Sequence, residues 1–363
     1  MATDYLNSKK IDHQVLNGIA DPLRVLDSEE KVVFVNEAMT KILGRDLTKL
    51  TCNINENIFN PDITKQVLKR GEVIQREETL KGKVYSVKCS PILGEDGKII
   101  GVVEVFRNVT VERKLQREII ERNRELMAET LAASQIQKTV LPPKGFLKNL
   151  KIDYIYKPSN ILSGDMFDIF EINKENIAVY ISDSVGHGFA ASMVTMFIKS
   201  LIRMLPLEIL LSPSKTLDAL SNRFSLLKLD IENYFTCFYG VFNVKKGTFI
   251  YANAGHLPLP IKVSSPNDFE HLEAVGNPIC RFFKEAKYQE YKVKCYAGDK
   301  ILLATDGITE ARNMEGQTYG IKRLEEIIIE NDVDELKILK ENIRSFLNII
   351  QTDDMSAVLL KVW

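Results

Sequence analysis

The chain has 363 residues, of which 45% are apolar and 27% charged, and its formal net charge is −1 at pH 7. This length exceeds one ordinary hydrophobic core, so two or three domains are expected. The nearly neutral charge gives no electrostatic reason for a nucleic-acid partner. No apolar run approaches the roughly 20 residues that span a bilayer, and no signal peptide is evident. We therefore expect a cytoplasmic protein without membrane contact, whose five scattered cysteines are reduced.

Residues 12–110 are predicted to form an α+β domain. The segment 25–36 has the pattern of two short strands around a polar turn, and a short helix is expected over 37–43. Two further β-rich runs, 83–92 and 97–110, are separated by GEDG, whose Asp-Gly is a strong hairpin signal.

The second zone, 111–140, is predicted to be one long helix, because it lacks Gly and Pro and interleaves basic with acidic residues. Its apolar residues recur at spacings of four and three, which is typical of a coiled-coil seam. The seam consists of Leu115, Ile119, Leu126, Ala133, Ile136 and Val140, interrupted by Arg122 and Glu129. A solvated single helix is the alternative. We favour a coiled coil that joins two copies into a homodimer, because the stretch is long and lies between two domains.

The third zone, 141–363, mixes strands and helices. Strands that neighbour each other in sequence, with helices grouped elsewhere, favour an α+β fold over a doubly wound parallel sheet. The expected strands are 177–183, 234–243, 247–254, 300–305 and 355–362, and the expected helices are 188–205, 214–228, 319–330 and 333–348.

Several acidic residues of the third zone stand at the ends of predicted strands or in turns. They are Asp165, Asp183, Asp306 and the pair Asp353–Asp354. Each alone is more typical of a turn or a cap. Several carboxylates that converge, however, would repel one another without a cation between them. Because Mg²⁺ and Mn²⁺ prefer oxygen ligands, the set predicts a divalent metal site.

The third zone resembles the PPM family of metal-dependent protein phosphatases, in the bacterial regulatory branch of the RsbU, RsbP and stage II sporulation protein E type. Five segments in order carry the resemblance: SGDMFDIF, DSVGHGFAASM, NAGHLP, ATDGITEARN and DDMSAVLL. It implies an α-β-β-α sandwich over 141–363. It also implies hydrolysis of phosphoserine or phosphothreonine in a partner protein, which in this branch is a small anti-sigma-factor antagonist.

The resemblance further implies two Mn²⁺ or Mg²⁺ ions as cofactors. Asp183 would bridge both metals, with help from the carbonyl of Ser184. Asp165 and Asp353 would serve the first metal, and Asp306 the second. The family's reaction is attack on phosphorus by a metal-bridging water or hydroxide, without a phosphoenzyme.

The loop after the bridging aspartate departs from the family order. The chain has Ser-Val-Gly-His-Gly at 184–188, where Val-Ser-Gly-His-Gly is usual. For His187 we favour a loop-fixing role over one as general acid or anion contact. Asn253 and His256 are expected to fix a loop as well. We find no basic cluster in the sequence that would bind a charged peptide, so the expected substrate is a folded phosphoprotein.

The first zone resembles PAS sensor domains over 12–110. Asn36 and the end of the zone, Asn108–Val109–Thr110, stand where that family often has Asn and Asp-Ile-Thr. The flavin-reactive cysteine motif of light-sensing relatives is absent, and His13 precedes the core, so a haem ligand is not evident. The domain either binds an unidentified ligand or only dimerises, and the residues leave both open.

Two functions of different classes follow. The first is a sensor-regulated, metal-dependent protein serine/threonine phosphatase. The second is a non-catalytic signalling scaffold with a degenerate phosphatase domain, and the complete set of four aspartates argues against it. A sensor histidine kinase is disfavoured, because 111–140 contains no histidine that could accept a phosphoryl group.

Overall fold

The computed structural model describes residues 14–43, 61–186, 188–228, 234–282, 287–347 and 351–363. The chain divides into two units, Met1–Glu125 and Leu126–Trp363. The predictions for His13, Cys52 and His187 fall outside the described residues. Within the described ranges, no helix combines the length and the apolar character needed to cross a membrane.

The first unit is built on a five-stranded antiparallel sheet with the strand order β2-β1-β5-β4-β3. Its elements are β1 (Leu23–Asp27), β2 (Val32–Val35), α2 (Glu37–Leu43), α3 (Pro61–Arg70), β3 (Ile74–Leu80), β4 (Lys83–Leu93) and β5 (Ile99–Asn108). The predicted strands, the β4–β5 hairpin and the helix α2 are confirmed. The helix α3 and the strand β3 were not predicted from the sequence.

Asn36, between β2 and α2, is fully buried and bonds to three segments of the first unit. Its Oδ1 accepts hydrogen bonds from the backbone N–H groups of Leu23 and Met39, each at 2.9 Å. Its Nδ2 donates to the carbonyls of Ile19 and Asp21, at 3.0 and 2.9 Å. One side-chain amide therefore joins the start of β1, the first turn of α2 and the segment that precedes β1.

The helix α4 (Thr110–Thr139) is continuous, as predicted. Asn108 stabilises its start, because Oδ1 of Asn108 accepts from the N–H of Thr110 at 3.1 Å and from its hydroxyl at 2.7 Å. An Asn therefore still caps the helix where PAS domains often have Asp. Arg113, in the first turn, forms an ion pair with Glu77 of β3. The pairing of α4 with a second copy remains a prediction.

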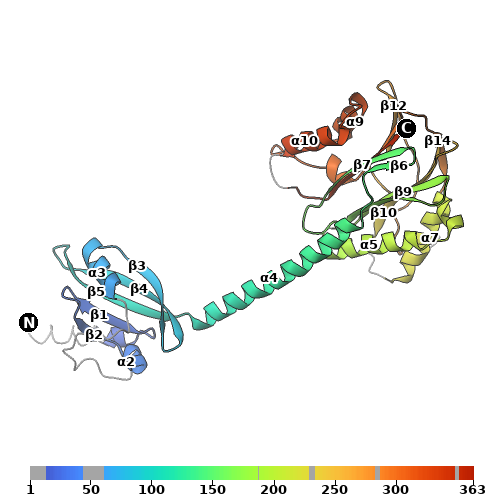
Figure 1. The fold of residues 1–363 in the computed structure, drawn as a ribbon. Coiled ribbons are helices and arrows are strands. Elements are labelled where there is room, and N and C mark those ends of the chain that lie inside the picture. The colour runs from blue at the N-terminus through green and yellow to red at the C-terminus, as the bar shows by residue number, and fades with distance from the viewer. Residues whose placement is uncertain (1–13, 44–60, 187, 229–233, 283–286, 348–350) are drawn as a thin grey trace, which may run out of the picture. The chain divides into compact units, whose positions relative to one another are not determined.

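The second unit consists of two antiparallel sheets that face each other, with helices outside each sheet (Figure 1). One sheet has the order β14-β11-β10-β9-β8 and the other β13-β12-β15-β16-β7-β6. The strands are β6 (Gly145–Leu147), β7 (Leu150–Lys157), β8 (Asp165–Glu171), β9 (Asn176–Ser184), β10 (Phe235–Asn243), β11 (Thr248–Ala254), β12 (Ile261–Ser265), β13 (Asp268–His271), β14 (Tyr291–Lys294), β15 (Lys300–Ala304) and β16 (Met355–Val362). The helices are α5 (Phe189–Arg203), α6 (Leu207–Leu210), α7 (Pro213–Leu226), α8 (Asp306–Thr309), α9 (Ile321–Glu330) and α10 (Glu335–Leu347).

Three apolar layers hold this unit together, and β9 contributes to two of them. Ile177, Val179 and Ile181 point into the core between the sheets. Ala178 and Tyr180 point the other way, into the layer formed with α5, α6 and α7. A third layer lies under α9 and α10. Burial on both faces explains why β9 is a continuous apolar run, and the layers confirm the predicted α-β-β-α sandwich.

A buried carboxylate attaches α5 to β8. Asp168 is completely buried, and its Oδ2 lies 2.7 Å from Nζ of Lys199 and 2.7 Å from Nε of Arg203, both on α5. The guanidinium of Arg203 also lies over the ring of Phe170, 4.0 Å from its centroid. Since α5 follows the loop that begins at Ser184, these contacts hold one side of the candidate site in place.

Replacement of Asp168 by alanine is expected to lower the free energy of unfolding of the second unit by about 3 kcal/mol, because it leaves the buried ammonium of Lys199 without its partner. The matched control is Glu175→Ala, which removes the partner of the exposed Lys245 and should cost less than about 1 kcal/mol. Urea unfolding followed by the fluorescence of Trp363, the chain's one tryptophan, measures both. Equal losses would contradict the role assigned to Asp168.

Candidate metal centre

Two carboxylates face each other across the β8–β9 pair. Asp165 begins β8, Asp183 stands one residue before the end of β9, and the two are direct register partners. Asp165 is only 1% exposed. Burial, and then the charge of Asp183, raise the pKa of Asp165 well above its ordinary value. Burial, followed by the charges of Asp306 and Asp353, raises the pKa of Asp183 to about 8. Two like charges in register repel, so this arrangement favours a cation or a proton between them.

Asp306 and Asp353 complete the set of four. Asp306 begins α8, directly after the strand β15 and Thr305. Burial, followed by the charges of Asp353 and Glu310, raises the pKa of Asp306 to about 6. Asp353 is exposed and lies two residues before β16. Because its charge acts on both Asp183 and Asp306, the structure brings the four predicted aspartates into one electrostatic cluster.

Two glycines allow the backbone segments of the site to approach each other. A Cβ atom on Gly307 would lie 2.0 Å from the carbonyl oxygen of Asp354. A Cβ atom on Gly164 would lie 2.9 Å from the carbonyl oxygen of Gly186 and 3.2 Å from that of Ser184. The distances of 2.0 and 2.9 Å are shorter than a carbon–oxygen contact permits, and the distance of 3.2 Å is tight. The Ser-Gly-Asp and Asp-Gly segments therefore require glycine, since any side chain would push the strand ends apart.

Asp354 differs from its neighbour Asp353, because its carboxylate accepts hydrogen bonds from two backbone N–H groups. It is 3% exposed, its Oδ1 accepts from the N–H of Ser159 at 2.6 Å, and its Oδ2 accepts from the N–H of Gly164 at 2.6 Å. The hydroxyl of Thr305 donates to Oδ2 of Asp165 at 2.8 Å. Asp354 and Thr305 are thus positioning residues. Sequence reasoning named Asp354 only together with Asp353 as an acidic candidate, and it did not identify Thr305.

Asn253 and His256 fix a loop, as expected. The side chain of Asn253 accepts from the N–H of His256 at 2.8 Å and donates to its carbonyl at 3.0 Å. His256 is fully buried, with Nε2 3.0 Å from the carbonyl of Ala304 and Nδ1 3.1 Å from the hydroxyl of Thr236. Burial lowers the pKa of His256 to about 4. The imidazole is therefore neutral, and it carries its proton on Nε2, since a carbonyl can only accept.

The end of α4 bonds to the site. Gln137 is 2% exposed, its Nε2 donates to the carbonyl of Ser163 at 2.8 Å, and its Oε1 accepts from the N–H of Ser163 at 3.1 Å. The hydroxyl oxygen of Ser163 in turn accepts from the N–H of Asp165 at 3.1 Å. Two hydrogen-bonding steps therefore connect the linker helix to a candidate metal ligand. Sequence reasoning missed Gln137, whose only signal is its place in QKTVLPP (137–143), the segment that leads from the linker helix into the second unit.

The chemistry of these donors suits a hard divalent cation. In the part of the chain that the structure describes, no three carboxylate, thiol or imidazole groups close around one point as a finished metal site. The donors are nevertheless all oxygens. Burial and mutual repulsion of the carboxylates raise the pKa values of Asp165, Asp183 and Asp306, and a cation between them would relieve this repulsion. Mg²⁺ and Mn²⁺ match such a set better than Zn²⁺.

An α-β-β-α sandwich that gathers four aspartates at its strand ends, preceded by a PAS-type sheet, defines the class of sensor-linked proteins with a PP2C phosphatase fold. Residues 173–363 match the family model for stage II sporulation protein E (SpoIIE), and residues 16–114 match a model for the PAS fold. The first match covers more than half of the chain. The chain belongs to the stage II sporulation protein E family.

Two curated relatives come from Bacillus subtilis (strain 168). The phosphoserine phosphatase RsbU is 33% identical over 193 residues, which are 53% of this chain and 56% of RsbU. The phosphoserine phosphatase RsbP is 28% identical over 181 residues, which are 49% of this chain and 44% of RsbP. The chain thus spans about half the length of these relatives.

Solved structures share the fold at low identity. The SiaA-PP2C domain of Pseudomonas aeruginosa aligns with a TM-score of 0.57 at 15% identity, over 67% of this chain and 99% of that domain. The PP2C phosphatase domain of SpoIIE from Bacillus subtilis, with a fragment of its regulatory domain, aligns with a TM-score of 0.51 at 14% identity, over 84% of this chain and 76% of that one. These likenesses establish the fold.

The neighbours Asp353 and Asp354 are expected to respond differently to the same substitution. Asp354→Asn turns an amide N–H₂ toward a backbone donor, so it should lower the free energy of unfolding by about 2 kcal/mol. Asp353→Asn, at an exposed site, should change it by less than about 0.5 kcal/mol. Urea unfolding in EDTA, read from Trp363 fluorescence, compares them. An unchanged stability of Asp354→Asn would contradict the backbone role of Asp354.

Proposed function

We propose that this chain is a sensor-regulated, metal-dependent protein serine/threonine phosphatase. The gathering of four aspartates around Asp183 is the observation that carries the proposal, because structural carboxylates do not need to face one another across two strands. The two relatives named phosphoserine phosphatases support it. The non-catalytic scaffold is the second candidate, and it has no comparable support, since none of the four aspartates is replaced.

In this proposal the four aspartates hold two divalent cations, Mn²⁺ or Mg²⁺. Asp183 would bridge them, with the carbonyl of Ser184 beside it, while Asp165 and Asp353 hold one ion and Asp306 the other. When bound, such a pair lowers the pKa of water, orients a phosphate ester and neutralises its charge. The chain's own residues supply rigidity, since the Thr305 hydroxyl holds the Asp165 carboxylate and the Ser163 hydroxyl holds the backbone N–H of Asp165 before any ligand arrives.

His256 takes no part in proton transfer in this proposal. Its imidazole is neutral at physiological pH and both ring nitrogens are occupied by Thr236 and Ala304. Its role is to tie the loop after β11 to the end of β15, immediately before Asp306. The reaction therefore depends on carboxylates and cations rather than on a histidine general acid inside the described part of the site.

The proposed substrate is phosphoserine or phosphothreonine on a folded regulatory protein. The branch resemblance of the sequence supports an anti-sigma-factor antagonist as that partner. The names of both relatives support phosphoserine in particular. In this proposal the protein acts in the cytoplasm, and its substrate is neither nucleic acid nor lipid.

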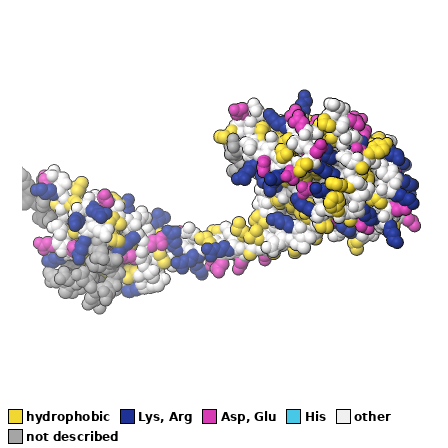
Figure 2. Space-filling view, turned by 45° about the horizontal axis from the view of Figure 1, so that its top comes forward, with side chains coloured by type: hydrophobic (Ala, Val, Ile, Leu, Met, Phe, Trp, Pro, Cys, Tyr) yellow, Lys and Arg dark blue, Asp and Glu magenta, His cyan; other side chains and the backbone are white. Residues whose placement is uncertain are grey.

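The proposed regulation passes through α4. Figure 2 shows hydrophobic side chains exposed among charged ones along this helix. The seam residues with 52–60% exposure are Leu115, Ile119, Leu126 and Ile136. Pairing with a second copy would cover them, and the polar interruptions Arg122 and Glu129 would keep the pairing weak enough to have two arrangements. Gln137 would pass a change of arrangement to Ser163 and Asp165.

Asp183→Asn should abolish Mn²⁺-stimulated hydrolysis of a generic phosphate ester, because it removes the charge that both cations would share. The same change removes one of the repelling charges, so the melting temperature in EDTA should not fall. Asp306→Asn and Asp353→Asn should also impair hydrolysis severely. Near-normal turnover of Asp183→Asn would refute the two-metal assignment. Inactivity of the wild-type chain with Mn²⁺ would favour the scaffold.

Ile119→Glu and Ile136→Glu together should give a monomer with altered basal activity, since two charges cannot be buried in the seam. Sedimentation of the full-length chain and its Mn²⁺-dependent activity test this. Arg122→Glu, at a polar position of the same seam, is the control and should leave more dimer. A wild-type chain that is monomeric at micromolar concentration would refute the homodimer, and activity indifferent to the double change would refute the coupling.

A further inference from the structure

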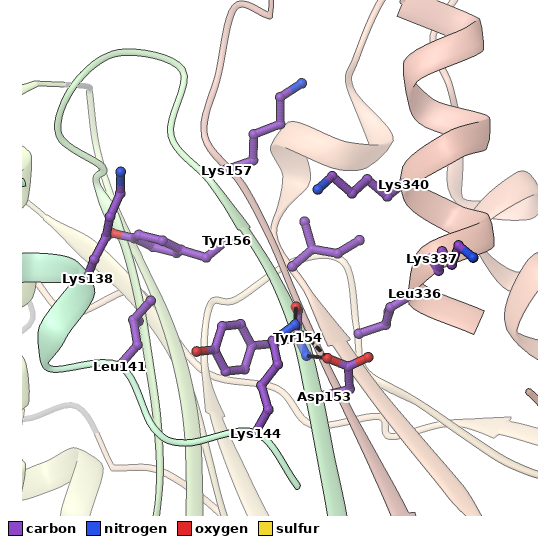
Figure 3. Close-up of a pocket in the computed structure, with 11 residues that line it drawn as sticks. Lys138, Leu141, Lys144, Asp153, Tyr154, Tyr156, Lys157, Leu336, Lys337 and Lys340 are labelled. Atoms are coloured by element: carbon purple, nitrogen blue, oxygen red, sulfur yellow. Dashed lines mark hydrogen bonds and ion pairs between the residues drawn. The ribbon is translucent and has the colours of Figure 1, made fainter. Parts of the chain in front are cut away.

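A cavity of about 550 Å³ lies on the second unit, between the end of α4, the strand β7 and the helix α10. Lysines from all three segments surround it: Lys138 near the end of α4, Lys144 just beyond it, Lys157 at the end of β7, and Lys337 and Lys340 on α10 (Figure 3). We call this cavity the lysine pocket. The sequence showed no basic cluster that would bind a charged peptide, and this cavity was not visible there because its lysines come from three separate segments of sequence.

The positive charge of the lysine pocket is largely uncompensated. Its one acidic residue, Asp153, is already paired with Lys144 at 2.7 Å. The other four lysines have no ion-pair partner among the described residues. Burial, followed by the charges of Lys340 and Arg344, lowers the pKa of Lys157. Cations that repel one another around a cavity favour an anion inside it.

The remaining walls of the pocket are apolar or aromatic. Leu141, Ile155 and Leu336 contribute aliphatic surface, and Tyr154 contributes a ring that the ammonium of Lys144 approaches to 4.6 Å from its centroid. A volume of 550 Å³ falls within the 300–1,000 Å³ that is typical of small-molecule sites. An inorganic phosphate alone would leave most of this space and all of the apolar wall uncovered. A suitable occupant combines several negative charges with a ring.

We propose that the lysine pocket binds a phosphorylated organic ligand of nucleotide size. The amines of Lys138, Lys157 and Lys340 would contact the phosphates, Lys337 would add positive charge at the rim, and the apolar wall would contact the organic part. This inference does not depend on the proposed phosphatase activity. It adds a ligand site to a unit for which only a metal centre had been inferred.

The position of the pocket gives the ligand a route to the metal centre. Lys157 pairs in register with Met355, and the carbonyl of Lys157 accepts from Nε2 of Gln351, which also donates to the carbonyl of Asp353 at 2.7 Å. On the opposite side, Lys138 directly follows Gln137, which bonds to Ser163. A ligand in the pocket would therefore join α4, β7 and α10 at points adjacent to both sides of the candidate metal centre.

Calorimetric titration of the full-length chain with ATP in EDTA tests the proposal. EDTA removes divalent cations from the aspartate cluster, whose carboxylates then repel the phosphates of ATP. We expect saturable binding that weakens with ionic strength. The double variant Lys337→Glu/Lys340→Glu should weaken it at least tenfold. Lys174→Glu/Lys322→Glu, which makes the same change of net charge at exposed lysines outside the pocket, should stay within about twofold. Trp363 fluorescence would show that each variant is folded.

Three further titrations distinguish an organic phosphate in the lysine pocket from inorganic phosphate and from binding at the metal centre. Inorganic tripolyphosphate should bind more weakly than ATP, because it cannot cover the apolar wall, and adenosine should bind more weakly still. Asp183→Asn should leave ATP binding unchanged, which places the ligand outside the metal centre. The proposal is overturned if ATP shows no saturable binding, if both double variants lose it equally, or if tripolyphosphate binds as tightly as ATP. Binding of an acidic peptide in place of ATP would also overturn it.

Discussion

The register of β8 against β9 is the constraint on which the candidate metal centre depends. It sets Asp165 directly opposite Asp183 on neighbouring strands, where two carboxylates repel each other. The strands tolerate this repulsion because β9 is buried on both faces, so sliding or separating the pair would expose apolar side chains from two cores at once. Packing energy from the whole sandwich thus holds like charges together, and in the proposed metal centre this repulsion would favour the binding of cations.

Local patterns predicted an α+β fold and the four aspartates, whereas the sandwich followed from the resemblance to the PPM family. The strand β9 is an apolar run with Asp183 near its end, and Asp353–Asp354 directly precede the apolar strand β16. Both the apolar pattern and the adjoining carboxylates are local features. The strand β8 was missed although it carries Asp165. Its sequence DMFDIFE places a second carboxylate, Asp168, in the middle, and only Lys199 and Arg203 from a distant helix make that burial acceptable.

The residues that position the site could not be found in the same way. Asp353 and Asp354 are adjacent and identical, yet one is exposed and the other accepts two backbone hydrogen bonds from residues about 190 positions away. Gln137 and the lysine pocket likewise acquire their meaning from contacts between segments that are far apart in sequence. No local pattern separates such residues from ordinary polar surface, so this part of the site becomes visible only in three dimensions.

The helix α4 carries Arg113, which pairs with the sensor sheet, and Gln137, which bonds beside Asp165, on one unbroken rod. A helix turns by about 100° with each residue, so the number of residues in a continuous helix sets the phase between side chains at its two ends. The length of the linker helix therefore sets a rotational phase as well as a separation. Insertion or deletion of whole heptads in such a linker changes this phase little, whereas the loss of one residue changes it by about 100° while leaving the composition almost unchanged.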